Sequence, residues 1–247
     1  MSVSKIAING FFGRMGQTIY NLSIKDKEKF KVTVGCDQKD KINLQHEISL
    51  TDDLSKLSDL FDVVIDFSLP EPSIKAVKTC EEISKPITIG TTGFSNEQKK
   101  YLIAASEKIP LLLAPNMSLG VNASLQSISD LSKLLTNYEV SIEETHHKNK
   151  IDSPSGTALK IADVIANARG IEASSIDIKA YREEGEIGVH KTIFKSDDDE
   201  IIIFHNAFNR SIFAKGALET SQWIANQKPG LYTYTVSYTH LRAHETS

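Results

Sequence analysis

The sequence predicts an α/β protein in which a doubly wound parallel sheet is followed by a second domain of α+β type. The first 115 residues alternate between short apolar runs and longer amphipathic segments. Short runs that are apolar throughout are typical of strands buried on both faces, as in a parallel sheet covered by helices. Beyond residue 137, strand-like segments dominate, which favours an antiparallel or mixed second sheet.

The first domain is expected to contain strands at 5–9, 30–35, 63–66, 86–90 and 110–114, with helices near 14–24, 71–84 and 95–107 between them. The last of these helices has a start signal, because Ser95 is followed three residues later by Gln98, as in a capping box. Regular alternation of strands and helices indicates a doubly wound sheet. We assign residues 1–117 to this domain.

The second domain, 118–214, is expected to contain helices at 121–135 and 155–168. Its strands are expected at 138–144, 177–182, 189–194 and 200–205. A final amphipathic helix is expected at about 211–226. Residues 236–247 show no clear periodicity, and we interpret them as a non-native tail outside the fold.

Composition excludes several classes of function. The net charge of −4 argues against non-specific binding to nucleic acid. No apolar run approaches the roughly 18 to 20 residues of a membrane helix, so no membrane association is expected. Cys36 and Cys80 are far apart, which is typical of reduced cysteines in a cytosolic protein. We therefore expect a cytoplasmic protein.

Three glycines follow the first strand with the spacing GxxGxxG, namely Gly10, Gly13 and Gly16. Glycines permit a turn tight enough for the N–H groups at a helix N-terminus to meet a pyrophosphate. Asp37 ends the second strand, where a carboxylate can hold ribose hydroxyls. Residues 90–93, Gly-Thr-Thr-Gly, follow the fourth strand. Together these features predict a Rossmann-like dinucleotide site, although the glycines alone would also suit a tight corner without a ligand.

The segment 143–157 contains the densest group of chemically active side chains. His146 and His147 end a strand, so their side chains point to opposite sides, and a histidine can donate a proton near neutral pH. Lys150 supplies a positive charge for a carboxylate. Residues 155–157, Ser-Gly-Thr, open a helix whose N–H groups offer an anion site. The segment indicates a proton donor acting on an acidic substrate; the alternative is a polar loop with a helix cap.

A metal site is not expected in this segment. The histidine pair lacks the i, i+4 spacing of HExxH, and no cysteine or third histidine lies nearby in the sequence.

Six blocks of sequence resemble successive blocks of the dihydrodipicolinate reductase family, in the family's order, over residues 4–234. The block at 146–157 is the most specific, since many dehydrogenases share the glycine loop. The blocks are Gly10–Gly16, Val64–Ser68, Gly90–Phe94, Ala114–Asn122, His146–Thr157 and Arg210–Ala217.

The resemblance implies a nucleotide-binding domain, to which a C-terminal helix at 215–235 returns, and a sheet domain that assembles a homotetramer. It implies reduction of a small dicarboxylate, 4-hydroxy-tetrahydrodipicolinate, to tetrahydrodipicolinate with loss of water, in lysine and diaminopimelate biosynthesis. By this resemblance His146 would be the proton donor and Lys150 its catalytic partner. His147, Gly156 and Thr157 would bind the substrate.

The same resemblance implies a cofactor, NADH or NADPH, bound by residues of four loops. These are Gly10, Gly13, Arg14, Met15, Gly16, Asp37, Gly90, Thr91, Thr92, Ala114, Pro115, Asn116 and Met117. Gln38 stands where some members carry an arginine that can meet a 2′-phosphate, so we expect NADH to serve at least as well as NADPH. Two alternatives are another two-domain NAD-dependent dehydrogenase, which leaves the histidine block unexplained, and a non-catalytic NAD-binding redox sensor, which would not need His146 and Lys150.

Overall fold

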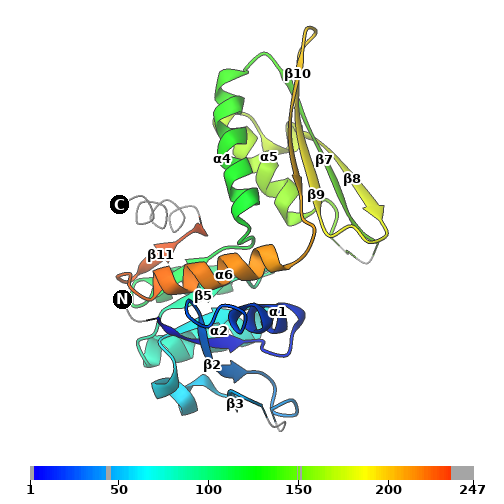
Figure 1. Ribbon diagram of the computed structural model, residues 1–247. Helices are drawn as coiled ribbons and strands as arrows, with labels where there is room; N and C mark the ends of the chain where they lie inside the picture. The colour runs from blue at the N-terminus through cyan, green and yellow to red at the C-terminus, as the bar shows by residue number, and fades with distance from the viewer. Residues whose placement is uncertain (1–2, 43–45, 149, 151, 235–247) are drawn as a thin grey trace. The chain divides into compact units, whose positions relative to one another are not determined.

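The structure is a computed structural model, and it describes residues 3–42, 46–148, 150 and 152–234 (Figure 1). The chain divides into two compact units. Unit 1 runs to Met117 and resumes at Ser211, and unit 2 runs from Ser118 to Arg210. The tail assigned to 236–247 lies outside the described residues. None of the helices in the described residues is long and apolar enough to cross a lipid bilayer.

Unit 1 is built on a seven-stranded sheet in the order β11-β6-β5-β4-β1-β2-β3, with every pairing parallel. The predicted doubly wound parallel sheet is confirmed. The winding changes direction at β1, which lies between β4 and β2, and ligands bind at such points in open α/β sheets. The strands are β1 (Lys5–Asn9), β2 (Lys31–Cys36), β3 (Ser49–Thr51), β4 (Val63–Asp66), β5 (Ile87–Ile89), β6 (Pro110–Leu113) and β11 (Gly230–Tyr232).

Helices cover both faces of this sheet, which explains why most residues of its central strands are apolar. Ile6 and Ile8 face the layer that contains α1 (Arg14–Ser23) and α6 (Ser211–Ile224). Ala7, between them on β1, faces the opposite layer. That layer contains α2 (Pro70–Glu82), α3 (Asn96–Ser106) and the 3-10 helix η1 (Leu54–Leu60).

The C-terminal part of unit 1 differs from the expectation. The helix expected over 215–235 is α6, which ends at Ile224, and Gly230–Tyr232 pairs with β6 as an edge strand. Pro229 explains the difference, because proline has no N–H for a helical hydrogen bond and its ring clashes with the preceding turn. The edge strands β3 and β11 have only three residues each, too few to produce a periodic signal.

Unit 2 contains a four-stranded mixed sheet in the order β10-β9-β7-β8, with β7 and β8 parallel and the other pairs antiparallel. The helices α4 (Leu119–Leu134) and α5 (Gly156–Arg169) pack on one face (Figure 1). Since α5 connects the parallel strands β7 and β8, its N-terminus lies just beyond the carboxyl end of β7. The strands are β7 (Glu139–His147), β8 (Asp177–Glu183), β9 (Val189–Lys195) and β10 (Glu200–Asn206), and a 3-10 turn η2 (Ala173–Ser175) precedes β8.

Candidate active site

The glycine loop of unit 1 follows the carboxyl end of β1. Gly10 has a φ of +80°, and a Cβ there would lie 2.6 Å from the carbonyl oxygen of Phe67. Gly16, in the first turn of α1, packs so closely that its Cβ would lie 2.3 Å from the carbonyl oxygen of Gly10. Gly13 is the N-cap of α1 and has no side chain to cover the first N–H groups of the helix. This cradle fits the pyrophosphate of a dinucleotide.

Asp37 lies beside the glycine loop, directly after β2. Its Oδ2 accepts a hydrogen bond from the Phe12 N–H (2.8 Å), and its Oδ1 accepts from the Gln38 N–H (2.8 Å) and from Lys41 Nζ (3.3 Å). A carboxylate offers about four acceptor directions, so room remains for a ribose hydroxyl. Asp37 therefore both fixes the loop and offers the acceptor that a dinucleotide needs.

The loop after β5 reaches the same carboxyl edge of the sheet. Thr91 donates its hydroxyl to Asp66 Oδ2 (2.6 Å) and accepts from the Ser68 N–H (3.0 Å). Asp66 is fully buried, and burial raises the pKa of its carboxyl. Gly90 packs closely against the loop after β4, because a Cβ there would lie 2.2 Å from Cε1 of the Phe67 ring. Thr91 thus holds the loop in place, while Thr92 is exposed.

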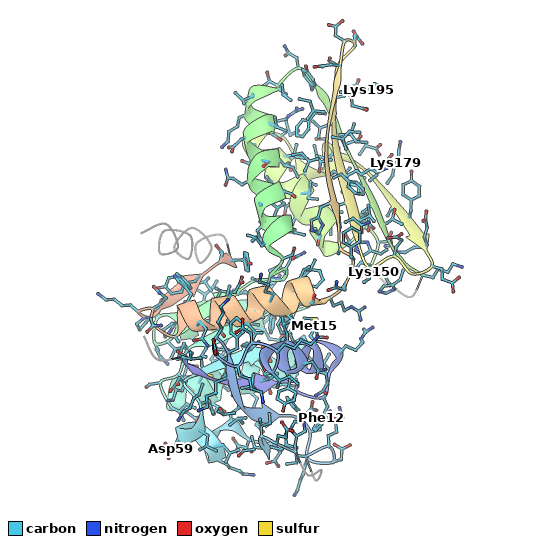
Figure 2. The ribbon with its side chains drawn as sticks, viewed as in Figure 1. Phe12, Met15, Asp59, Lys150, Lys179 and Lys195 are labelled. Atoms are coloured by element: carbon cyan, nitrogen blue, oxygen red, sulfur yellow. The ribbon has the colours of Figure 1, made fainter. Side chains whose placement is uncertain are left out.

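The remaining predicted cofactor residues differ in how they can contribute. Arg14 is exposed and Met15 half-buried in the first turn of α1; Figure 2 shows Met15 there. After β6, the Ala114 N–H donates to the carbonyl oxygen of Ile89 (3.0 Å). Pro115 is exposed and Asn116 half-buried. The side chain of Met117 is buried in the core, so this residue can offer a ligand only its backbone.

In unit 2, His146 and His147 end β7 and lie on opposite faces of its sheet. His146 is buried, and its Nδ1 is hydrogen-bonded to Oε2 of Glu144, two residues earlier on the same face. His147 is half-buried on the other face, and its Nδ1 has no hydrogen-bond partner within the described part of the chain. His146 and His147 therefore cannot act in the same way on one small ligand.

Glu144 is the centre of a polar cluster that the sequence motifs do not reveal. Its Oε1 accepts from Arg182 NH1 (3.0 Å) and from the Ser155 N–H (3.3 Å). The sheet register creates the cluster: Glu144 lies opposite His190 on β9, and His146 lies opposite Arg182 on β8. Only the spacing of Glu144 and His146, two residues apart on one strand, could have been noticed in the sequence.

His190 forms the inner side of this cluster. Its Nε2 lies 3.1 Å from the Ser155 hydroxyl, and its ring centroid lies 5.1 Å from that of His146. Burial lowers the pKa of His190 to about 3, and the positive charges of His146, His205 and Lys150 act in the same direction. His190 is therefore neutral at physiological pH.

The electrostatic environment of His146 contains opposing contributions. Burial lowers its pKa, whereas the negative charge and hydrogen bond of Glu144 raise it; Lys150 and Arg182 lower it again. The net direction is downward. An anionic ligand near His146 would act in the upward direction, because a negative charge stabilises the imidazolium.

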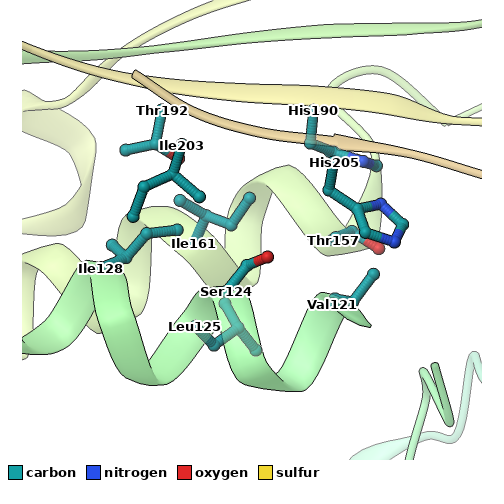
Figure 3. A pocket seen from close by; sticks show the side chains of 10 residues that line it. All are labelled: Val121, Ser124, Leu125, Ile128, Thr157, Ile161, His190, Thr192, Ile203 and His205. Atoms are coloured by element: carbon teal, nitrogen blue, oxygen red, sulfur yellow. The ribbon is translucent and has the colours of Figure 1, made fainter. Parts of the chain in front are cut away.

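Lys150 lies in the loop after β7, and the N-terminus of α5 follows at the end of that loop. Lys150 Nζ binds both carboxylate oxygens of Asp152 (2.8 and 2.9 Å) and lies at the opposite end of the sheet from Lys195 (Figure 2). Gly156 is exposed, and a Cβ there would meet no described heavy atom within 4 Å. Thr157 is half-buried and lines a small pocket with His190 and His205, two histidines whose pKa is lowered by burial (Figure 3).

Glu144, His146 and His190 are also of the residue types that ligate metals, and one ligand atom from each lies within 4.8 Å of the others. The sequence argument that no third histidine is near therefore does not hold in three dimensions. However, Glu144 already accepts hydrogen bonds from His146, Arg182 and Ser155. A second cation beside the Arg182 guanidinium would be repelled. We interpret the cluster as a hydrogen-bond network.

Comparison with known proteins identifies relatives along nearly the whole chain. Family models described as "Dihydrodipicolinate reductase, N-terminus" and "Dihydrodipicolinate reductase, C-terminus" match residues 4–117 and 120–236. A 4-hydroxy-tetrahydrodipicolinate reductase of Buchnera aphidicola subsp. Cinara cedri is 37% identical over 93% of this chain and 94% of its own. A relative of the same name from Buchnera aphidicola subsp. Schizaphis graminum is 37% identical over 93% of this chain and 95% of its own.

Solved structures show the same fold. A dipicolinate-bound dihydrodipicolinate reductase from Paenisporosarcina sp. TG-14 covers 94% of this chain and 98% of its own, with a TM-score of 0.80 and 24% identity. An amine dehydrogenase from Mycobacterium smegmatis has a TM-score of 0.67 at 9% identity, over 94% and 95% of the two chains. Because the two family models together match residues 4–117 and 120–236, the chain belongs to the dihydrodipicolinate reductase family.

Proposed function

We propose that this chain reduces 4-hydroxy-tetrahydrodipicolinate to tetrahydrodipicolinate with NADH or NADPH, with release of water. The names of the two relatives at 37% identity support this reaction. It would place the chain in lysine and diaminopimelate biosynthesis, in the cytoplasm. The nicotinamide cofactor supplies the hydride when bound, and the cradle of Gly10, Gly13 and Gly16 would hold its pyrophosphate.

One observation carries the proposal: a buried histidine, a lysine and a helix N-terminus adjoin one loop after β7. These are His146, Lys150 and the Gly156–Thr157 end of α5. A dicarboxylate needs two anion-binding groups, and Lys150 and the α5 N-terminus provide two of different kinds. Lys150 would exchange Asp152 for a substrate carboxylate. His147, on the other face of β7, would contribute to binding and not to proton transfer.

His146 would deliver the proton that the reduced ring needs. Loss of water from the 4-hydroxy substrate would give a conjugated imine. Addition of hydride to that imine leaves an electron-rich enamine, which must take up a proton. Bound carboxylates would raise the pKa of His146 above its value in the free protein. The imidazolium would then be present when the proton is required, and Lys150 would support the reaction by holding the substrate against it.

NADH should be used at least as well as NADPH. Asp37 would accept hydrogen bonds from free ribose hydroxyls and would repel a 2′-phosphate. Gln38 offers no positive charge to compensate. Lys41 Nζ, 3.3 Å from Asp37 Oδ1, reduces the negative potential and makes the preference modest.

A homotetramer is also proposed, on the open face of the unit 2 sheet. That face exposes Tyr181 (44%), Ile202 (48%) and Phe204 (56%), three large apolar side chains that would be buried by another copy. Size-exclusion chromatography with light scattering tests it: a monomer mass at micromolar concentration would exclude the tetramer.

Steady-state kinetics of site variants tests the catalytic assignment. His146→Gln should lower kcat by about 10²- to 10⁴-fold, the usual contribution of general acid catalysis, with NADH affinity unchanged. Lys150→Ala should lower kcat and raise KM together, while His147→Ala should mainly raise KM. Lys148→Ala is the matched control, since Lys148 is exposed and, among the described residues, its ion pair is with the exposed Glu184. Near-normal turnover by a His146→Gln, Lys150→Ala double variant would refute the assignment.

A further inference from the structure

Glu144 is a fully buried carboxylate for which the proposed reaction provides no direct role. An isolated buried carboxylate is costly and usually takes up a proton. Here Arg182 NH1 lies 3.0 Å from Oε1, and the Ser155 N–H at the start of α5 lies 3.3 Å from the same oxygen. A guanidinium and a helix N-terminus both stabilise negative charge. Both contacts are with hydrogen-bond donors, which is the arrangement that a carboxylate requires.

An ionised carboxylate can only accept hydrogen bonds. Because Glu144 Oε2 is bonded to His146 Nδ1, that nitrogen must carry a hydrogen whether the ring is neutral or charged. The other nitrogen, Nε2, is then the only one of the two that can gain or lose a proton. The Glu144 contact thus determines which atom of His146 can take part in proton transfer.

The surroundings of Nε2 contain a second feature that favours Nε2 as the atom that transfers the proton. A Cβ built on Gly188 would lie 3.0 Å from His146 Nε2 and 3.4 Å from Cδ2. The φ of Gly188 is not in the left-handed region, so the backbone does not require glycine there. The absence of a side chain at position 188 instead leaves Nε2 accessible from that side.

We propose that Glu144, held by Arg182 and by the Ser155 N–H, is the positioning residue of His146, and that it presents Nε2 as the proton-donating atom. This inference rests on the proposed function and adds to it. In the imidazolium both nitrogens carry hydrogen. Nε2 gives its proton to the reduced substrate, the electron pair of the N–H bond stays on Nε2, and the Nδ1–H remains bonded to Glu144.

The charge of Glu144 has a measurable effect on this histidine. The charged and titratable groups that face His146 are Glu144 on β7, Lys150 in the following loop, Arg182 on β8 and His190 on β9. Among them only Glu144 favours the imidazolium, whereas burial, Lys150 and Arg182 disfavour it. Replacing Glu144 by glutamine keeps the shape and removes the charge, so the pKa of His146 must fall.

The first test needs no substitution in the network. ¹⁵N NMR of histidine-labelled wild-type protein, with the His146 signals identified from their loss in His146→Gln, reports which ring nitrogen is protonated. We expect neutral His146 to carry its hydrogen on Nδ1. A neutral ring with the hydrogen on Nε2 would overturn the inference, whatever the enzyme's activity.

The second test compares Glu144→Gln with wild type in the pH dependence of kcat. Activity that depends on imidazolium falls as pH rises through the pKa of His146. In Glu144→Gln this fall should occur at lower pH, with a loss of about tenfold at neutral pH for each unit of pKa, partly recovered in acid. Glu144→Asp keeps the negative charge, so its fall in kcat should occur at a pH nearer to that of wild type. A loss of the same factor at every pH would mean a structural role only, and no loss would mean no role.

Glu143→Gln is the matched control, because Glu143 lies on the opposite face of β7 and pairs with Lys191 (3.6 Å). It should leave the pH profile unchanged. Gly188→Ala should lower kcat without moving the NMR pKa of His146, and unchanged turnover would show that access to Nε2 does not matter. The NMR results could be as expected while kcat of wild type shows no fall as pH rises through the pKa of His146. In that case the proton-donor assignment fails and the positioning by Glu144 stands.

Discussion

The close packing of Gly16 against the glycine loop predicts a specific defect in Gly16→Ala. The added Cβ would lie 2.3 Å from the carbonyl oxygen of Gly10 and 2.5 Å from that of Phe11. Real Cβ atoms essentially never approach closer than 3.0 Å, so the loop and α1 must separate by about 0.7 Å or more. Both contacts are backbone atoms, and no side-chain rotation can relieve them.

This displacement should affect both stability and cofactor binding. Overpacking of this kind typically costs about 1–3 kcal/mol. Moving the α1 N–H groups away from a pyrophosphate should cost at least about 1.4 kcal/mol of binding free energy, a tenfold rise in the Kd for NADH. Fluorescence titration of NADH, without substrate, measures this directly, and a thermal melt confirms that the variant is folded.

Asn21→Ala is the matched control, since Asn21 is an exposed position on the same helix. It should bind NADH as wild type does. A Kd of Gly16→Ala within twofold of wild type would refute the assignment of the pyrophosphate to the N-terminus of α1.

Three further predictions concern charge, pH and chain length. Asp37→Asn should narrow the gap between the KM values for NADH and NADPH, and a wild-type KM for NADPH tenfold or more below that for NADH would overturn the Asp37 assignment. Because His190 has a pKa of about 3 when folded and about 6.5 when unfolded, wild-type stability should fall as pH drops from 6.5 towards 3, by up to about 1.4 kcal/mol per unit. Urea titrations give the free energy of unfolding at each pH, and its dependence on pH should be shallower by one proton in His190→Gln than in wild type. Equal pH dependence in the two proteins would contradict the buried neutral state of His190. Deleting residues 236–247 should change the free energy of unfolding by no more than about 0.5 kcal/mol; a large drop in melting temperature would show that the tail packs.

The parallel sheet of unit 1 could be predicted from its sequence because its strands are buried on both faces. Val63–Asp66, for example, is buried at every position. A strand of this kind has no solvent-exposed face, so its sequence is a nearly continuous apolar run that is easily recognised. β3 and β11 escaped prediction because three-residue edge strands are specified by their neighbours and not by their own composition. The final helix expected from the pattern, 211–226, agrees closely with α6, whereas the range implied by the resemblance, 215–235, extends past Pro229.

The candidate site could be predicted only in part from the sequence, and for a different reason. His146, Lys150 and Thr157 lie within one short segment, so their spacing alone suggests shared chemistry. Arg182 and His190 come from other strands, and their approach to Glu144 depends on the register of the sheet. A shift of one residue would turn each side chain to the opposite face. Register follows from packing and turn geometry across the unit, which a motif does not contain.

The most direct measurement is the rate of NADH oxidation by the purified chain with freshly generated 4-hydroxy-tetrahydrodipicolinate, beside His146→Gln. The proposed function predicts substrate-dependent turnover by wild type, and a loss of about 10²- to 10⁴-fold in the variant with unchanged NADH binding. Absence of substrate-dependent oxidation by a folded wild-type protein that binds NADH would contradict the proposed reaction. Equal turnover by wild type and variant would contradict the role of His146.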